Sequence, residues 1–210
     1  MIITNSAFAA VLPATTDKDR SRFFLNAVAI EPDGRVVATN GHVLLTARSK
    51  AVTPDEDFPV VPGATFNGNP ASQVLVHADI VTSILAAMPK SARGLPICRM
   101  AQLSTNGSPM TYTLAATDLS APRIATIAAD HVQTFPAYDR IYQSCTKTAT
   151  TSLGVPVLEA LIKSAKAVGA AGITFTIPAA DPTGAIVSSI RVAIDGSDTT
   201  VDGVIMPMRA

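Results

Sequence analysis

The sequence predicts an α+β fold made of one repeated unit, in which a short strand is followed by a helix and then by three more strands. Segments of strand and helix character recur in this order three times, with a period of about 70 residues, although the residues themselves do not repeat. Apolar residues at helical spacing mark the helices of the second and third units. Turn sequences such as Glu31–Gly34 and Asn40-Gly41 separate segments of strand character. We therefore expect three βαβββ units along the chain.

The first unit occupies the N-terminal part of the chain. We expect a strand at Met1–Thr4, a helix at Ser6–Leu12, and then strands at Arg22–Glu31, Arg35–Thr39 and His42–Ala47. Pro32 and Gly34 suit a tight turn between the first two of these later strands. Both residues of Asn40-Gly41 tolerate positive φ, which favours a hairpin between the last two.

The second unit follows a Pro-rich passage, Val52–Pro62, which we expect to be a surface connection because Pro removes backbone donors and stiffens the chain. A helix at Asp79–Met88 places its apolar residues on one face, and Pro89 ends it. These apolar residues are Ile80, Val81, Ile84, Leu85 and Met88. The strands of the unit are expected at Gln73–Val76, Leu95–Met100, Thr111–Ala116 and Arg123–Ala128.

The third unit contains the clearest helix and follows a link around Tyr142–Thr151. Pro156 suits the first turn of this helix and Gly169 suits its end. Its buried side chains are expected to be Val157, Leu158, Leu161, Ile162, Ala165 and Val168. Strands are expected at Gly172–Ile177, Ala185–Ile194 and Thr200–Met206, the second of them rich in β-branched residues.

The composition is that of a globular protein without bulk attraction to a charged ligand. The chain has 210 residues, 48% of them apolar, and its 16 basic residues balance 16 acidic ones. This allows a sizeable buried core and offers no overall steering towards nucleic acid, membranes or acidic ligands. No apolar run reaches the roughly 18 to 20 residues that span a bilayer, and the N-terminus lacks the features of a signal peptide. We expect a soluble, cytoplasmic protein.

The cysteines and histidines indicate neither a metal site, nor a cofactor, nor a catalytic centre. Cys98 and Cys145 lie far apart without CxxC spacing, so we expect small buried thiols rather than a disulfide or a metal site. The histidines, His42, His77 and His131, are scattered and lie in no HExxH, GxSxG, GxGxxG or GxxxxGK(S/T) motif. An enzyme, such as a hydrolase of unknown substrate, is the alternative from another class of function, and its turnover would depend on His42.

Three separated stretches resemble one protein family. Arg22–Asn26, followed by Val37–Leu44, is similar to the "YYLNG" and "ATDGHRL" sequences in the middle domain of the bacterial DNA polymerase III β subunit, a sliding clamp. Phe135–Ile141 is similar to the "FPDYRRV" that leads out of that domain, and Val204–Ala210 to the C-terminal "VVMPMRL". Because their order and the terminal position of the last stretch also agree, the chain is identified as a shortened, phage- or mobile-element-like member of this family.

The resemblance implies a DNA clamp fold, with antiparallel sheets that carry helices on one face. Residues 1–138 resemble the middle clamp domain, which has two βαβββ units. Residues 139–210 resemble the second half of the last domain, which is a single unit. The chain would therefore hold about one and a half clamp domains.

The resemblance further implies a DNA polymerase processivity factor with an apolar groove for the short motifs of polymerases and other replication proteins. The groove residues carried over are Leu25, Thr39, Gly41, His42, Leu44, Pro136, Ile141, Val204, Met206, Pro207 and Met208. Their chemistry is suitable, because Met side chains adapt to apolar ligands and Gly41 lets a peptide approach the backbone. His42 or Thr39 could fix the peptide by hydrogen bonds. The chain departs from the family at Asn40, Val43 and Ala210, which replace an Asp, a basic residue and a Leu, and these changes could alter which motifs bind.

Clamps of this family encircle double-stranded DNA without reading its sequence, so they need only diffuse attraction to phosphates. The candidate DNA-facing residues are Lys90, Arg93, Lys163 and Lys166, with Lys18, Arg20 and Arg22 as a further set. The alternative is that these side chains are solvated, and Glu159 is placed to pair with Lys163.

A half domain predicts self-assembly, because a lone βαβββ unit leaves an edge or an apolar face uncovered. We expect a homo-oligomer, a dimer or a tetramer. Two copies joined through their third units about a two-fold axis would contain three domain equivalents, and two such dimers could close a ring. The alternative with the same fold is a decoy or regulator that binds clamp-binding motifs without encircling DNA.

Overall fold

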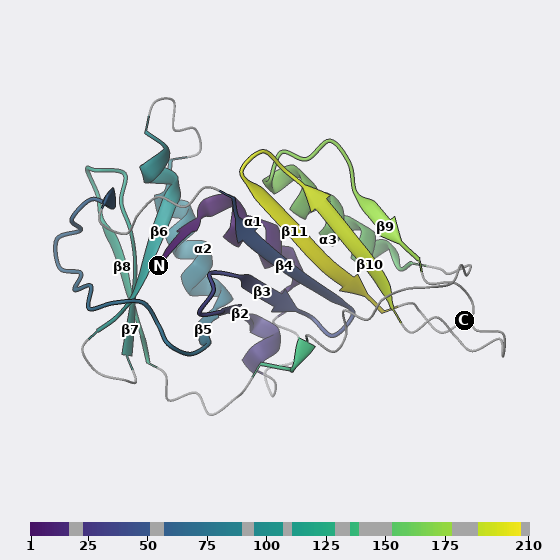
Figure 1. The fold of residues 1–210 in the computed structure, drawn as a ribbon, viewed down its shortest axis with the longest axis horizontal. Coiled ribbons are helices and arrows are strands. Elements are labelled where there is room, and N and C mark those ends of the chain that lie inside the picture. The colour runs from purple at the N-terminus through teal and green to yellow at the C-terminus, as the bar shows by residue number, and fades with distance from the viewer. Residues whose placement is uncertain are drawn as a thin grey trace.

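The computed structural model describes residues 1–16, 23–50, 57–89, 95–106, 111–128, 135–138, 153–177 and 189–206. Within these ranges the strands form two antiparallel sheets, with the orders β1-β6-β7-β8 and β5-β2-β3-β4-β11-β10-β9 (Figure 1). The α+β class with antiparallel sheets, expected from the sequence, is confirmed.

The first unit contains β1 (Ile2–Thr4), α1 (Asn5–Val11), the 3-10 segments η1 (Leu12–Ala14) and η2 (Phe23–Asn26), β2 (Ala27–Ile30), β3 (Val36–Thr39) and β4 (Val43–Ser49). Thr4 caps α1, because its side chain accepts a hydrogen bond from the backbone N–H of Ala7. Gly34 has φ of +83° in the turn between β2 and β3, which favours glycine there.

The second unit contains β5 (Val74–His77), α2 (Ala78–Ala87), the 3-10 segment η4 (Pro96–Arg99), β6 (Met100–Thr105), β7 (Thr111–Ala116) and β8 (Arg123–Ala128). Val81, Ile84 and Met88 are buried as expected, and Ile80 and Leu85 are partly buried against the same core. Asp79 in the first turn of α2 complements the helix dipole.

Two expected strands are wrong in the same way. The segment expected as the strand Arg22–Glu31 has a 3-10 turn at Phe23–Asn26 before the strand β2 begins. The segment expected as the strand Leu95–Met100 is a 3-10 turn from Pro96, and the strand β6 follows it. Pro96 fits this first turn because its φ is fixed and it has no N–H to donate to a strand ladder.

The third unit contains α3 (Val155–Ala167), β9 (Thr174–Thr176), β10 (Ile190–Asp195) and β11 (Thr199–Ile205). Pro156 lies in the first turn of α3, and Gly169 follows its end with φ of +65°. The expectation that Ile162 is buried is wrong, since 47% of its surface is exposed. Ala160 and Ser164 are buried instead, because α3 turns that side towards α1.

The first two units interlock by exchanging their first strands. β1 of the first unit pairs with β6 of the second, and β5 of the second unit pairs with β2 of the first. Each sheet therefore takes one edge strand from the other unit. The third unit joins the first through β11, which pairs with β4 along seven register positions from Thr199 to Ile205.

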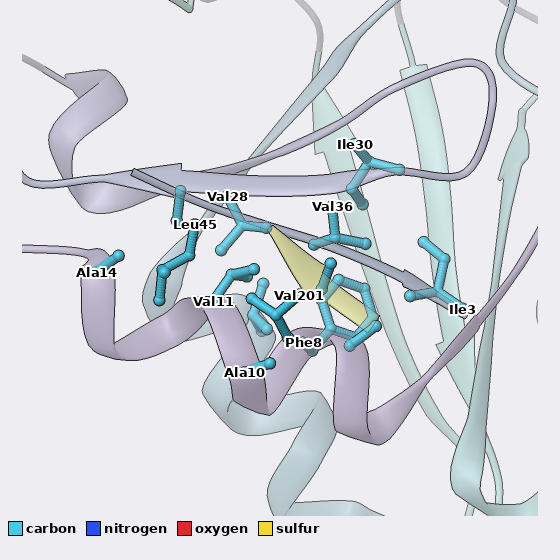
Figure 2. Packing of buried hydrophobic residues seen from close by; sticks show 14 of the residues in the cluster. Ile3, Phe8, Ala10, Val11, Ala14, Val28, Ile30, Val36, Leu45 and Val201 are labelled. Atoms are coloured by element: carbon cyan, nitrogen blue, oxygen red, sulfur yellow. The ribbon is translucent and has the colours of Figure 1, made fainter. Parts of the chain in front are cut away.

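A shared core lies between the helices and the sheets. α1 contacts β3, β4 and β11 on one side and both α2 and α3 on others. Phe8 and Val11 of α1 point at Val28, Leu45 and Val201 of the seven-stranded sheet (Figure 2). Residues that alternate with these along the strands face the opposite, outer side of the sheet.

Polar contacts also attach the third unit to the first. The hydroxyl oxygens of Ser6 and Thr199 are 2.7 Å apart, and Ser6 donates a hydrogen bond to a carboxylate oxygen of Asp198 at 3.0 Å. The Ser164 hydroxyl of α3 donates to the backbone carbonyl of Ala10 in α1. Because these groups are buried or partly buried, each hydrogen bond offsets the cost of removing them from water, and deleting one partner would leave the other unsatisfied.

The Pro-rich passage is only partly a surface connection. Phe58 and Val61 are buried, where they pack against Met100 and Ala115 on the four-stranded sheet, whereas Val60 between them is 92% exposed. Cys98 is a buried free thiol, as expected, and Cys145 lies outside the described residues. None of the described helices has the length and apolar character needed to cross a bilayer.

Candidate binding site

A pocket of about 170 Å³ lies on the outer side of the seven-stranded sheet, where β4 of the first unit meets β11 of the third. We call it the seam pocket. Its lining residues are Phe24, Leu25, Thr39, Gly41, His42, Val43, Leu44, Pro136, Val204 and Met206. They come from the η2 segment, the β3–β4 hairpin, the segment 135–138 and the end of β11.

The floor of the seam pocket depends on close pairing of β4 and β11. Leu44 is opposite Val204 in the register, so both side chains point to the outer side. Beyond β11, the backbone N–H of Met206 donates to the carbonyl of His42 at 3.1 Å. At Gly203 a Cβ would lie 2.7 Å from the carbonyl oxygen of Leu44, so glycine allows the strands to approach this closely.

The polar side chains of the β3–β4 hairpin form hydrogen bonds with the backbone of the same hairpin. Gly41 has φ of +85°, and the Asn40 side chain accepts hydrogen bonds from the backbone N–H groups of His42 (3.0 Å) and Val43 (2.9 Å). The Thr39 hydroxyl donates to the Val43 carbonyl at 2.8 Å and accepts from the Gly41 N–H at 3.2 Å. The Thr39 hydroxyl proton is therefore used within the hairpin. The exposed His42 is the lining side chain whose ring nitrogens remain available for a hydrogen bond with a ligand.

The segment 135–138 forms one wall of the seam pocket and is fixed by aromatic packing. The Phe135 ring meets those of Phe24 and Tyr138 edge-on, at centroid distances of 6.3 and 6.0 Å. Phe135 and Tyr138 are buried in a cluster with Ala29, Val37 and Leu44 of the outer sheet face. Pro136, between them, is thereby held at the pocket.

A polar anchor holds the far end of this wall. The Tyr138 hydroxyl donates to a carboxylate oxygen of Glu31 at 2.9 Å, and the Gln73 amide donates to the same oxygen at 2.7 Å. The Arg35 guanidinium lies over the Tyr138 ring, 5.7 Å from its centroid. Such a cation and ring contribute about 0.5–1 kcal/mol at a partly exposed site.

Asp33 orients Arg35 through an ion pair, with Nε of Arg35 2.8 Å from a carboxylate oxygen of Asp33. Nη2 of Arg48 lies 2.5 Å from the same oxygen. Partial burial acts to raise the pKa of Asp33. The hydrogen bond from the Arg35 N–H and the positive charges of Arg35 and Arg48 outweigh it, so this pKa lies below its ordinary value.

The seam pocket itself is apolar. Of its described lining residues only His42 can carry a charge, and Leu25, Leu44 and Val204 are buried at its base. Met206 is 41% exposed at the rim, where its flexible side chain can adapt to a ligand. Among the described residues no group of three His, Cys, Asp or Glu side chains is placed to hold a metal ion. The geometry is suited to holding an apolar side chain.

The structure brings together eight of the eleven groove residues that the sequence analysis names: Leu25, Thr39, Gly41, His42, Leu44, Pro136, Val204 and Met206. Ile141, Pro207 and Met208 lie outside the described residues. Two lining residues were missed, Phe24 and Val43. In a strand, the Phe24 side chain would point to the face opposite that of Leu25, but the 3-10 turn brings both side chains to the pocket. The Val43 side chain faces the core, and Val43 borders the pocket because it is the first residue of β4.

Of the residues expected to face DNA, Lys163 and Lys166 lie exposed on α3. Lys90, Arg93, Lys18, Arg20 and Arg22 lie outside the described residues. Glu159 and Lys163, which are both described, form no ion pair, so the local pairing expected between them is not present.

The whole chain superposes on solved sliding clamps. It matches the DNA polymerase III β subunit of Thermotoga maritima with a TM-score of 0.57 at 12% identity, and the DnaN sliding clamp of Pseudomonas aeruginosa bound to griselimycin with a TM-score of 0.57 at 16% identity. It spans 64% and 65% of the length of those chains. It also covers 98% of the PCNA of A. fulgidus bound to the C-terminal region of FEN-1, with a TM-score of 0.56 at 12% identity.

No protein-family model and no curated protein sequence matches the chain. At these identities the similarity to the solved structures establishes the fold, which is that of the sliding clamps.

Proposed function

We propose that this chain, which has the sliding-clamp fold, is a DNA polymerase processivity factor rather than an enzyme. It would bind short apolar motifs of replication proteins in the seam pocket and encircle duplex DNA as an oligomeric ring in the cytoplasm. The observation that carries the proposal is the convergence of three stretches, distant in sequence, on one apolar pocket at the β4–β11 seam. Two of the similar clamp structures have a ligand bound, namely griselimycin and the C-terminal region of FEN-1.

The size of the seam pocket favours a peptide over a small-molecule substrate. Pockets that enclose whole small ligands usually measure roughly 300–1,000 Å³, whereas this one measures about 170 Å³. It can therefore hold one or two apolar side chains of a longer ligand that continues over the surface. A linear peptide has this form, and the exposed His42 at the rim can accept or donate a hydrogen bond to its backbone.

The proposed hold on DNA is topological. A ring needs only diffuse attraction to phosphates, so equal numbers of basic and acidic residues do not oppose it. Lys163 and Lys166 on α3 are the described candidates for this attraction. Their individual removal should weaken DNA retention only slightly, because each contributes one charge among many.

The peptide site can be tested with a fluorescein-labelled peptide that carries the clamp-binding motif of a bacterial replicative polymerase. We expect Met206→Asp to weaken binding at least tenfold in fluorescence anisotropy, because it places a charge at the rim of an apolar pocket. Val60→Asp is the matched control, since Val60 is also an exposed apolar residue but lies away from the pocket. Equal affinities for wild type and Met206→Asp would refute the site.

The ring can be tested separately by loading the protein onto nicked circular DNA and passing the complex through a gel-filtration column. A clamp stays with the circle and leaves when the DNA is linearised by a restriction enzyme. A decoy that only occupies clamp-binding motifs would bind the peptide but would never be retained on the circle.

A further inference from the structure

A row of side chains crosses the outer side of the seven-stranded sheet and includes the floor of the seam pocket. Five residues on successive strands are opposite one another in the register: Thr39, Leu44, Val204, Arg191 and Thr176. Opposite residues of paired antiparallel strands point to the same sheet face. We call these five residues the outer row. Its first three members line the seam pocket, and Arg191 of β10 is the next residue beyond them.

The seam pocket is closed towards β2 and β3 and open towards β10. On the closed side, the segment 135–138 packs on the outer face of those strands. On the open side, Ala193 of β10 and both Thr174 and Thr176 of β9 are exposed. The strands β4, β11, β10 and β9 lie side by side in this order (Figure 1). Because the pocket holds only one or two apolar side chains, a longer ligand has to leave it, and within the described part of the chain the way over β11 and β10 is open.

Arg191 is the first charged side chain of the outer row that such a ligand meets. The Cβ atoms of opposite residues, such as Val204 and Arg191, are about 4.5–5.5 Å apart. An extended peptide advances about 3.3 Å per residue. The guanidinium of Arg191 is therefore within reach of a ligand residue one or two positions from the one in the pocket. Arg191 is partly buried, so salt screens its charge less than that of a fully exposed side chain.

The surroundings of Arg191 favour a side-chain carboxylate over the C-terminal carboxylate of a ligand. Terminal carboxylates are commonly bound by clusters of backbone N–H groups. Here the backbone is engaged in the sheet, because β10 pairs with β11 on one side and with β9 on the other. Hydrogen-bond donors for a ligand on this face therefore come from side chains. A guanidinium is well suited, since its N–H groups match the two oxygens of a carboxylate.

We propose that Arg191 makes the seam pocket selective for peptides that carry an Asp or Glu beside the apolar residue in the pocket, on the side of β10. This inference rests on the proposed function, because it names the class of peptide that the same pocket binds. The exposed Thr176, opposite Arg191 on β9, adds a hydroxyl that can donate to the same carboxylate.

Asp202 of β11 limits this selectivity. It is opposite Ala193 and thus diagonal to Arg191 on the outer side of the sheet. Diagonal neighbours are within reach of long side chains, so the negative charge of Asp202 repels an acidic ligand residue bound at Arg191. Removal of this charge should strengthen the binding of an acidic peptide, which is the opposite of the effect of removing Arg191.

The test uses a fluorescein-labelled, C-terminally amidated peptide with the clamp-binding motif of a bacterial replicative polymerase. It is made in two versions, with Asp or with Asn at the residues that flank its apolar residues. We expect wild type to bind the Asp version about fivefold more tightly in fluorescence anisotropy at low salt. Arg191→Ala should abolish this preference and leave the affinity for the Asn version unchanged. Arg123→Ala is the matched control, because it removes the same charge from an exposed position on β8 of the other sheet and should keep the preference.

Asp202→Asn gives a second measurement that does not depend on the folding of Arg191→Ala. It should bind the Asp version about twofold more tightly than wild type does, because a like charge is removed. The affinity for the Asn version should not change. An unchanged or weaker affinity of Asp202→Asn for the Asp version would contradict a carboxylate bound beside Arg191.

Equal affinities of wild type for the two versions would overturn the proposal, as would a preference that persists in Arg191→Ala. A third version with Asn and a free C-terminus separates the two sources of a carboxylate, and a preference for this version alone would also overturn it. If wild type binds none of the versions, the proposed function fails. If it binds the Asp and Asn versions equally well, only the role of Arg191 is refuted.

Discussion

Replacing Gly203 by alanine tests whether the close β4–β11 seam is needed for both stability and the pocket. The added Cβ would lie 2.7 Å from the Leu44 carbonyl oxygen and 2.8 Å from Cδ2 of the fully buried Leu45. Contacts this short require movement, and the carbonyl belongs to strand β4, which is paired on both sides. Forced overpacking costs about 1–3 kcal/mol, while the loss of unfolded-state freedom returns about 0.4–1 kcal/mol. We expect a net destabilisation of about 1–2 kcal/mol.

The assay is urea denaturation followed by far-ultraviolet circular dichroism, since the chain has no tryptophan. With an m-value of about 2 kcal/mol/M, the midpoint of Gly203→Ala should fall by about 0.5–1 M. Gly172→Ala is the matched control, because a Cβ at Gly172 would meet nothing within 4 Å. Peptide affinity should fall in Gly203→Ala as well, since Val204 and Met206 follow directly on β11. If Gly203→Ala unfolds at the same urea concentration as Gly172→Ala, the seam is not as tightly packed as we argue.

Three further predictions concern polar contacts around the seam pocket and the third unit. Tyr138→Phe removes the 2.9 Å hydrogen bond to Glu31 and should reduce peptide affinity several-fold by loosening the pocket wall; unchanged anisotropy titrations would show that this anchor is dispensable. Ser164→Ala deprives the Ala10 carbonyl of its buried side-chain donor and should lower the free energy of unfolding by about 1–2 kcal/mol in urea, so an unshifted midpoint would contradict it. The pKa of Asp33 is lowered in the folded state, so its stabilisation is present above its unfolded pKa of about 3.9 and is lost as the pH falls through the folded value. The urea midpoints of wild type and Asp33→Asn should therefore differ at pH 7 and converge below about pH 4, and a difference that persists at pH 2 would refute this.

Most of the helices and strands could be predicted from the sequence because their signals are local, although the described part of the third unit has α3 and three strands without the strand expected before the helix. The helix at α2 follows from apolar spacing, and that at α3 from Pro156 and Gly169 at its ends. The β3–β4 hairpin follows from Asn40-Gly41, and Gly41 has a positive φ in the structure. Such features depend on neighbouring residues in the chain, so sequence reasoning finds them.

The errors occur where the equivalent segment of two units leads into a central strand. In both units a 3-10 turn precedes the strand, at Phe23–Asn26 before β2 and at Pro96–Arg99 before β6. Both segments contain apolar residues that favour a strand when considered alone. Their conformation is set by the tertiary structure, which is why propensity failed.

The pocket was predictable in part for a different reason. Leu44 and Val204 are 160 positions apart, and only the order of three matching stretches suggested that they meet; the β4–β11 register brings them face to face. Phe24 was missed because a strand places successive side chains on opposite faces, whereas the 3-10 turn brings Phe24 and Leu25 to one pocket. The division at residues 138 and 139 stays a prediction.

Ile162 shows why the remaining error carries information. The spacing of Leu158, Ile162 and Ala165 predicts burial, yet within one chain Ile162 is 47% exposed. β11 at one side of the third unit is joined to β4, while β9 at the other side pairs with β10 and with no further strand among the described residues. At 100° per residue, Ile162 lies about 160° around α3 from Ser164, which contacts Ala10 of α1, so the apolar stripe of α3 is wider than the surface that α1 covers.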